Sequence, residues 1–365
     1  MLDANSSLPH DGPTVIVELM GATHDVDRVF NHASNPHYGI TQASEKPEQP
    51  PTIPIPYTTE RFPKLTPSYA TLFGNLNEAT TKQVRSHPGC YIALIPFGAG
   101  QRLTQDNPEL AKDLETFLKS LGFPGSNHLQ VARPTPSVVP PNRARFAKPF
   151  PYLLLNAPEP LCRLLLWQQT FAFQINSKHL AFNAVSPDVQ VESWVILNLS
   201  GSFVTPEQLH MINALRTIAT TLMTDRAFLS MTNTQLAKRG IGKTATERAM
   251  ISISTFRLTF IPRTLEDGIE QPIWQLQGMP ISRDLKTHLV WLRIIRRTHF
   301  MVNNILSLEP DKSPFGCVWC KAETHSSENC PLPNTNDWKG PTPAHEYLTP
   351  DPPVRASDSK KHWPK

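Results

Sequence analysis

Three cysteines and one histidine lie within 14 residues, with the types and spacing of a metal site. Cys317, Cys320, His325 and Cys330 follow the pattern C-x2-C-x4-H-x4-C. Three thiolates and one imidazole complete a tetrahedral set for zinc and leave no ligand position for a substrate. The pattern therefore predicts a structural zinc ion, which would drive the folding of a segment too short to bury a core of its own.

Chance spacing and disulfide bonding are the two alternatives to a metal site for these cysteines. With five Cys and 13 His in 365 residues, chance would give this spacing on the order of 3 times in 100,000 such chains. Three clustered cysteines are an odd number, and no secretory signal opens the chain, so a reducing compartment, nucleus or cytoplasm, is expected. Cys90 and Cys162 stand in apolar sequence and are expected to be buried small hydrophobes.

The spacing is that of the CCHC zinc knuckle, and residues 317–330 resemble the nucleocapsid proteins of retroviruses and retrotransposons. The resemblance implies binding of single-stranded RNA or DNA, with an aromatic ring against unstacked bases and basic side chains on phosphates. Trp319 would supply the ring, a contact of roughly 1–3 kcal/mol per base. Lys321 would be a basic contact within the same segment.

The formal charge of this segment points to phosphate contacts elsewhere. Zinc with three thiolates and a neutral histidine sums to −1, and Glu323, Glu328 and Lys321 bring the total to −2. An anionic segment repels phosphates. Either another part of the chain supplies positive charge, or the segment is a stabilising or protein-binding element.

A helix expected over residues 282–298 offers such charge. At about 100° per residue, Lys286, Arg293 and Arg297 fall within about 20° of one direction, and Arg283 lies about 60° away. The alternative is an ordinary solvated face, which is the usual meaning of a run of charges. A second basic cluster consists of Lys238, Arg239, Lys243 and Arg248.

Length and composition allow two folded units with tails. A chain of 365 residues can hold two domains of ordinary size. Its 37 prolines against 16 glycines cluster, which indicates linkers and tails around the folded units. A net charge of +4 permits a nucleic-acid partner without requiring one. No run approaches 18 uncharged apolar residues, so no membrane span is expected, while a homo-oligomer stays open.

The apolar pattern predicts five parts. They are a disordered Pro-rich region over 1–79, folded units over 80–185 and 190–310, the zinc knuckle over 315–332, and a disordered basic tail over 333–365. Within the first part, the apolar run 15–20 is expected to be either an edge strand or a docking segment. The tail ends with the basic residues Lys360, Lys361 and Lys365.

Both folded units are expected to have the order βαββαβ, which predicts an α+β fold of two ferredoxin-like units. The first would have strands at 91–97, 128–132, 151–156 and 171–175, and the second at 193–199, 256–261, 273–277 and 302–308. The RNA recognition motif shares this topology, but its basic-Gly-aromatic signature is absent from both units. Aromatic residues on these strands are therefore expected to fill cores; they are Tyr152, Phe171, Phe173, Phe256, Phe260 and Trp274.

No catalytic motif is recognisable in the chain. The run 240–244, Gly-Ile-Gly-Lys-Thr, lacks the first glycine of a phosphate-binding loop because Ala237 stands there. Two ferredoxin-like units followed by a CCHC knuckle resemble the first-open-reading-frame, Gag-like proteins of non-LTR retrotransposons, including fungal ones. The resemblance implies a non-enzymatic protein that coats RNA or single-stranded DNA. The alternatives are a protein–protein interaction module stabilised by zinc, and an inactive remnant of such an element.

Overall fold

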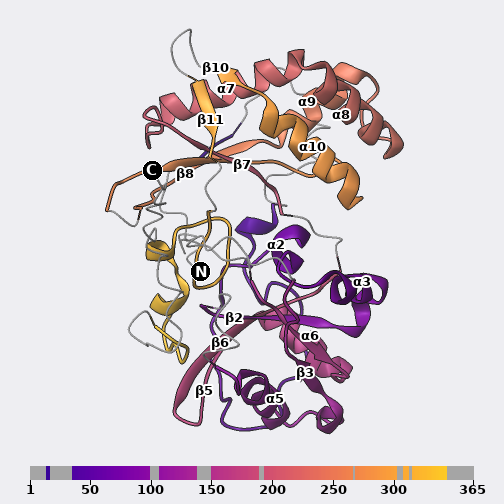
Figure 1. Ribbon diagram of the computed structural model, residues 1–365, viewed down its shortest axis with the longest axis vertical. Helices are drawn as coiled ribbons and strands as arrows, with labels where there is room; N and C mark the ends of the chain where they lie inside the picture. The colour runs from indigo at the N-terminus through magenta and orange to yellow at the C-terminus, as the bar shows by residue number, and fades with distance from the viewer. Residues whose placement is uncertain are drawn as a thin grey trace, which may run out of the picture.

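Two antiparallel sheets, each covered by helices, make up a mixed α+β architecture (Figure 1). The computed structural model describes residues 14–16, 35–98, 107–137, 149–188, 193–265, 268–301, 307–311 and 315–342. The first unit contains a five-stranded sheet and the second a six-stranded sheet. The Cys/His segment, residues 315–342, lies along one side of the molecule between them, drawn in yellow in Figure 1.

The first unit has the strand order β3-β4-β2-β6-β5, with every neighbouring pair antiparallel. Its elements are β2 (Ile92–Pro96), α5 (Leu110–Ser120), β3 (Gln130–Ala132), β4 (Tyr152–Leu155), α6 (Glu159–Gln168), β5 (Thr170–Ile175) and β6 (Lys178–Val185). The sequence predicted one closing strand at 171–175. The structure instead has a hairpin, and β6, not β5, pairs with the central strand β2.

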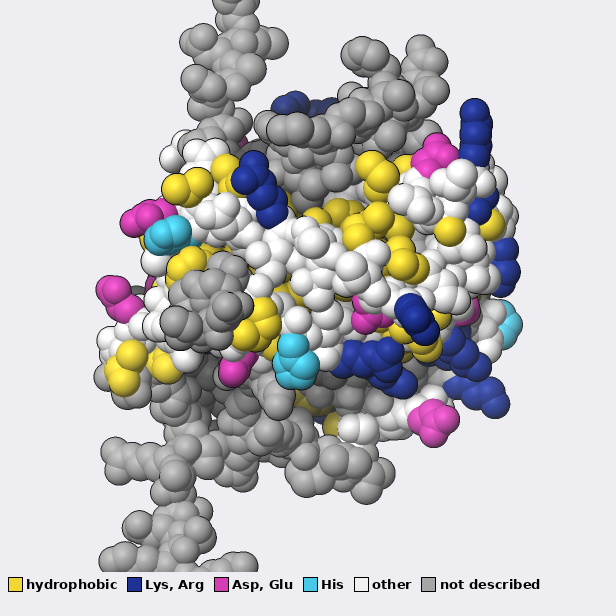
Figure 2. All heavy atoms as spheres, turned by 90° about the horizontal axis from the view of Figure 1, so that it is seen from above, with side chains coloured by type: hydrophobic (Ala, Val, Ile, Leu, Met, Phe, Trp, Pro, Cys, Tyr) yellow, Lys and Arg dark blue, Asp and Glu magenta, His cyan; other side chains and the backbone are white. Residues whose placement is uncertain are grey.

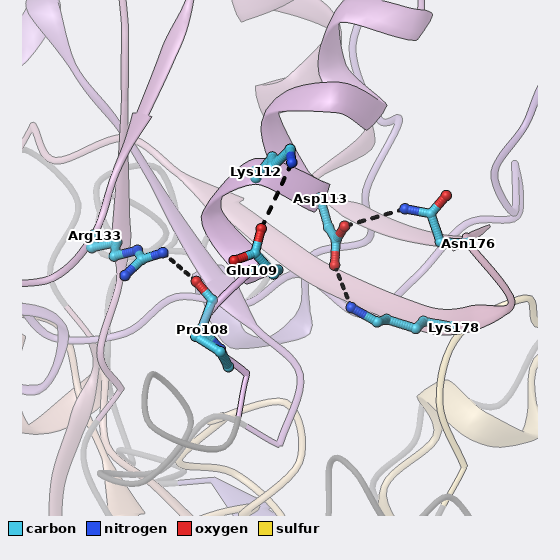
Figure 3. Close-up of polar contacts among 7 residues, drawn as sticks. All are labelled: Pro108, Glu109, Lys112, Asp113, Arg133, Asn176 and Lys178. Carbon is cyan, nitrogen blue, oxygen red and sulfur yellow. Dashed lines mark hydrogen bonds and ion pairs between the residues drawn. The ribbon is translucent and has the colours of Figure 1, made fainter.

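A tight turn explains this hairpin. Asn176 and Ser177 both have positive φ, 49° and 63°, as the two central residues of a type I′ turn require. The buried Asp113 of α5 holds the turn in place, because its carboxylate accepts hydrogen bonds from Lys178 Nζ at 2.8 Å and from Asn176 Nδ2 at 3.5 Å (Figure 3). Figure 3 also shows Arg133, beside β3, donating to the carbonyl of Pro108 before α5.

Both faces of the first sheet are covered, because alternate residues of β2 point to opposite sides. Ile92 and Leu94 belong to the core beneath α5 and α6. Ala93 and Ile95 belong to a second core that is closed by α2 (Tyr69–Phe73) and α3 (Glu78–Ser86). The structure therefore differs from the expected disorder of residues 1–79 over the range 35–79. Apolar residues spread among the prolines cover this second face; they are Phe62, Leu65, Tyr69, Leu72, Phe73 and Leu76.

The second unit has the strand order β1-β8-β9-β7-β11-β10. Its elements are β1 (Thr14–Ile16), β7 (Val195–Ser200), α7 (Gln208–Thr224), α8 (Arg226–Lys238), α9 (Ala245–Ser254), β8 (Arg257–Ile261), β9 (Ile273–Gln277), α10 (Leu285–Arg297), β10 (Phe300–Met301) and β11 (Ser307–Pro310). The edge-strand interpretation of the run 15–20 is confirmed for Val15 and Ile16, which belong to β1 and pair with β8 at the edge of the sheet, and residues 17–20 lie outside the described residues. The helix α9 was not predicted, and most of the strand expected at 302–308 lies outside the described residues.

The four helices α7–α10 lie on one face of the second sheet, the upper face in Figure 1. Trp274 and Leu276 of β9 point into this core, as do Phe256 and Leu258 beside them. The core roles expected for the strand aromatics are confirmed for five of the six, which are at most 1% exposed, whereas Phe260 is only partly buried. The opposite face, which contacts the Cys/His segment, is mainly polar, with one small apolar cluster of Ile261, Ile273 and Phe315.

Candidate metal centre

The four predicted ligands converge on one point. One ligand atom from each of Cys317, Cys320, His325 and Cys330 lies within 4.8 Å of the others, and all four residues are buried. Cys320 Sγ is 3.3 Å from His325 Nε2. A tetrahedral zinc ion would hold a sulfur and a nitrogen about 3.6 Å apart, given bonds of about 2.3 and 2.1 Å. The cluster could therefore hold a metal ion.

Short-range hydrogen bonds shape the loop that carries the first two cysteines. Lys321 N donates to Cys317 O at 3.0 Å, and Cys317 N donates to the carbonyl of Ala322 at 2.8 Å. Lys321 closes this turn in the left-handed region, at φ 66°, a conformation that costs a non-glycine residue some free energy. Val318 N donates to Ser327 Oγ at 3.0 Å, which links the loop to the 3-10 turn Ser327–Asn329 before the last ligand.

The thiols of the cluster differ in how readily they ionise. Burial opposes ionisation of all three, and together with Cys317 it raises the pKa of Cys320 and of Cys330. At Cys317, burial is outweighed by hydrogen bonds from Cys320 and Cys330 and by His325, so its pKa is lowered. Because a metal ion takes thiolates as ligands, loading must release protons from Cys320 and Cys330.

The ring of Trp319 is buried against another side chain of the protein. It is 8% exposed and stacks on Phe97 of the first unit, with centroids 5.7 Å apart and planes 18° apart. The backbone strengthens this contact, because Gly98 N donates to Trp319 O at 2.6 Å. Lys321 is 2% exposed. Neither side chain presents a surface to nucleic acid in this conformation, so the contacts predicted for both would require the segment to detach from Phe97.

Residues after the last ligand continue the contact with the first unit. Trp338 packs against Phe97 and Phe62, with centroids 5.7 and 6.0 Å away. Thr58 Oγ1 donates to Asp337 O at 2.8 Å and accepts from Lys339 N at 3.0 Å. The expected disordered tail of 333–365 is thus ordered over 333–342, where Trp338 packs against apolar side chains of the first unit.

Glu323, between the second and third ligands, connects the segment to both units. Its carboxylate accepts hydrogen bonds from Thr71 Oγ1 of α2 at 2.5 Å and from Ser193 Oγ, just before β7, at 3.2 Å. Its backbone carbonyl accepts from Gln275 Nε2 of β9 at 2.6 Å. On the other flank, Asn183 Nδ2 of β6 donates to Cys320 O at 3.3 Å. The Cys/His cluster therefore lies between the two sheets and is hydrogen-bonded to both.

Polar side chains on the opposite face of the second sheet find hydrogen-bond partners in the Cys/His segment and in residues near it. Gln277 Nε2 donates to Gln275 Oε1 at 2.8 Å, and Asn35 Nδ2 donates to Gln277 Oε1 at 2.8 Å. Both glutamines are at most 1% exposed. The alternation Trp-Gln-Leu-Gln in the sequence suggests a strand with one solvated face. Here that face is buried, and side-chain amides replace water as hydrogen-bond partners.

Ser193 lies beside a histidine and a carboxylate, which sequence reasoning did not single out. Its Oγ is 3.0 Å from His37 Nε2, and that nitrogen also accepts from Trp194 N at 3.1 Å. In a nucleophilic triad the histidine lies between the hydroxyl and the acid. Here Ser193 lies between His37 and Glu323 and is 3% exposed, an arrangement that fits a structural hydrogen-bond chain.

The predicted basic residues lie apart from the metal centre. Lys286, Arg293 and Arg297 are exposed on α10, as the helical spacing predicted. Figure 1 draws this helix at the upper right and the Cys/His segment at the left. The run 240–244 forms the turn before α9. There the carboxylate of Glu247 accepts from Lys243 N at 2.6 Å, so the protein's own acid occupies the backbone donors that a phosphate would need.

The two remaining cysteines correct an expectation. Cys90 is exposed in the short turn before β2, and Cys162 is only partly buried on α6. The apolar residues next to them in sequence are buried, but the two cysteines are not fully buried themselves. Cys90 comes before the buried strand β2, and Cys162 lies at the edge of the buried face of α6.

Comparison with models of known protein families, with curated proteins and with solved structures gives no match for this chain. Among the described residues, no helix combines the length and the apolar character needed to cross a membrane.

Proposed function

We propose that this chain is a non-enzymatic, zinc-binding protein that binds single-stranded RNA or DNA, with the metal in a structural role. The observation that carries the proposal is the separation of the two features. The ligand set is closed and buried between the units, whereas Lys286, Arg293 and Arg297 are exposed on α10. The cations that would contact phosphates therefore lie on α10, and the metal would hold the two folded units together.

Two further expectations from the sequence agree with this proposal without being required by it. A ferredoxin-like interpretation of the two units and a Gag-like ribonucleoprotein role in the nucleus or cytoplasm would both suit it. In the second sheet, β8, β9, β7 and β11 are neighbours in this order, as a ferredoxin-like unit would have them. The proposal itself depends on charge and burial.

The test is a titration of a fluorescent single-stranded oligonucleotide with the zinc-loaded protein at two salt concentrations. We expect affinity to fall steeply with salt, by roughly 0.7 in log–log slope per phosphate contact. The triple variant Lys286→Glu, Arg293→Glu and Arg297→Glu should abolish binding. A matched control with the same charge change uses three exposed cations of the first unit, Lys82→Glu, Lys112→Glu and Arg163→Glu, and should retain most of it. Equal affinities of the two triple variants would contradict the proposal.

A second candidate is a protein-binding role of the same helix face. Leu289 and Val290 are 39% and 40% exposed among the cations of α10. Apolar residues on such a face suit a protein partner, which includes a second copy of the chain. A homo-oligomer in sedimentation that dissociates on Leu289→Glu, together with no oligonucleotide binding at low salt, would favour this candidate.

A further inference from the structure

The end of α8 lies beside the start of α10. Arg239, the C-cap of α8, donates through Nη1 to the carbonyl of Ile281 at 3.4 Å, just before α10 begins. Burial, and then the nearby charge of Arg283, lowers the pKa of Arg239. Two basic clusters that are joined by a contact across 42 residues of sequence are therefore neighbours on one surface.

This surface holds the positive charge of the protein. Residues 226–254 and 283–297 contain ten Lys or Arg against the two acids Glu247 and Asp284, a net charge of +8, whereas the whole chain carries +4. The rest of the chain is therefore net negative, at −4. Lys and Arg side chains gather at the right of Figure 2, the side on which Figure 1 places α8 and α10.

The two acids offset only two of the ten positive charges of this surface, and both carboxylates cap helices. Glu247 accepts from Lys243 N and Thr244 N at the start of α9. Asp284 accepts from Thr287 N at 2.8 Å at the start of α10. Within the described part of the chain, no ion pair involves the exposed cations of this surface, which are Arg226, Lys238, Arg239, Lys243, Arg283, Lys286, Arg293, Arg296 and Arg297.

The turn between α8 and α9, residues 239–244, is held in a fixed shape. Gly240 and Gly242 have φ of 69° and 68°, in the left-handed region that favours glycine. Arg248 braces the turn, donating to the carbonyls of Ile241 at 3.0 Å and Gly242 at 2.9 Å. Lys243 is thus presented from a rigid turn, which reduces the entropy lost when it contacts a ligand.

Rings that could stack on bases are missing from this surface. Phe228 of α8 and Trp291 of α10 are both 0% exposed. Across all described residues, no Phe, Tyr or Trp is among the exposed large hydrophobic side chains. Base stacking needs an open ring face, whereas contacts to phosphate need only cations and hydrogen-bond donors.

We propose that α8, the turn 239–244 and α10 form one surface that binds the phosphate backbone of nucleic acid without stacking on bases, so that duplexes bind as well as single strands. This inference rests on the proposed function and deepens it. It adds Lys238 and Lys243 to the contact residues, and it replaces a preference for unpaired bases with recognition of polyanionic charge. Binding is then independent of sequence, and its affinity is set by the number of phosphates contacted.

The experiment compares a fluorescent single strand of about 20 nucleotides, long enough for several phosphate contacts, with its duplex over a series of salt concentrations. We expect both to bind, with log–log slopes near −0.9 per contact for the duplex and −0.7 for the single strand. Lys238→Glu with Lys243→Glu should weaken binding of both by about tenfold or more and make both slopes shallower. The control pair Lys82→Glu with Lys112→Glu has the same charge change on the first unit and should leave the slopes unchanged.

The outcomes separate the inference from the proposed function. Binding of the single strand without the duplex would overturn the inference and leave the proposed function standing. The same holds if the Lys238 and Lys243 substitutions have no effect while the triple substitution on α10 abolishes binding. If neither oligonucleotide binds the zinc-loaded protein at low salt, both the inference and the proposed function fail. Circular dichroism of each variant verifies that it is folded, as expected for exposed side chains.

Discussion

The ring of Trp319 lies nearly parallel to that of Phe97, with 5.7 Å between centroids, although 222 residues separate the two in sequence. The aromatic residue that a nucleic-acid-binding knuckle would turn toward a base is here turned toward the protein. This one contact changes what the metal centre is expected to do, because it makes the Cys/His segment part of the interior.

Trp319→Ala should destabilise the protein without weakening nucleic-acid binding by the folded fraction. Removing a buried tryptophan costs about 3–5 kcal/mol, through lost contacts and the cavity left behind. Thermal unfolding followed by near-ultraviolet circular dichroism measures this loss. Trp338→Ala is a suitable comparison, since that ring is only partly buried, and its effect should be smaller. A Trp319→Ala protein of unchanged stability that has lost oligonucleotide affinity would show that the ring stacks on bases after all.

Removing the metal should loosen the junction between the two units. Cys330→Ser deletes one ligand, and we expect it to lower the zinc content below one ion per chain and to expose the segment to limited proteolysis. Loading at about 1,000 times Kd stabilises a protein by about 4 kcal/mol, so a chelator should lower the Tm of the native protein toward that of the variant. Cys90→Ser, at an exposed cysteine outside the cluster, is the control and should behave as the native protein. Equal zinc content in both variants would rule out the proposed ligand set.

Glu323→Gln tests whether the segment joins the units through its carboxylate. Both oxygens accept hydroxyl donors, and a glutamine amide group can accept from only one of them. Because one hydroxyl then loses its acceptor in a buried site, the expected cost is about 1–3 kcal/mol in denaturant unfolding. Glu328→Gln is the matched control, an exposed acid of the same segment whose change should be near neutral. The carboxylate has no joining role if the two variants are equally stable.

Acid should destabilise the second unit through His288. Burial, and secondarily Arg296, lowers the pKa of His288 from 6.5 to about 4. Above pH 6.5 the ring is neutral in both states and its effect on stability is absent. Between pH 6.5 and 4 the unfolded chain takes up the proton and the folded chain does not, so stability falls by up to about 3 kcal/mol.

The comparison that isolates this effect is His288→Gln, measured by urea unfolding from pH 7 to 4. Both proteins lose stability through the metal ligands, which protonate in acid. Only the native protein should show the additional loss below pH 6.5. Parallel stability curves for the two proteins would exclude His288 as the cause.

The convergence of the four Cys and His side chains could be predicted from sequence because their geometry is local. Four side chains within 14 residues need only a turn and a short 3-10 helix to meet. The exposed stripe of α10 was predictable for the same reason, since helical spacing fixes the direction of each side chain. In both cases the prediction involved no contact between distant parts of the chain.

The contacts that bury the segment depend on distant residues, and the sequence gives no sign of them. Nothing in the alternation of β9 distinguishes glutamines that face water from glutamines that pair with Asn35 and the carbonyl of Glu323. Likewise, the prolines of residues 35–79 indicated disorder, but scattered apolar side chains such as Phe62 are enough to cover a sheet face. Composition is a property of the segment alone, whereas its burial depends on the other parts of the chain that pack against it.

The position of residues 315–342 between the two sheets also affects the order of folding. Residues 315–342 supply partners for Thr71, Asn183 and Gln275, all of which the ribosome produces much earlier. Until residues 315–342 emerge, the polar face of the second sheet and the ring of Phe97 lack these partners, and contacts of long sequence separation form slowly. The junction between the two units is therefore completed only after residues 315–342 have been synthesised, and a metal ion bound by the Cys/His cluster would then hold it closed.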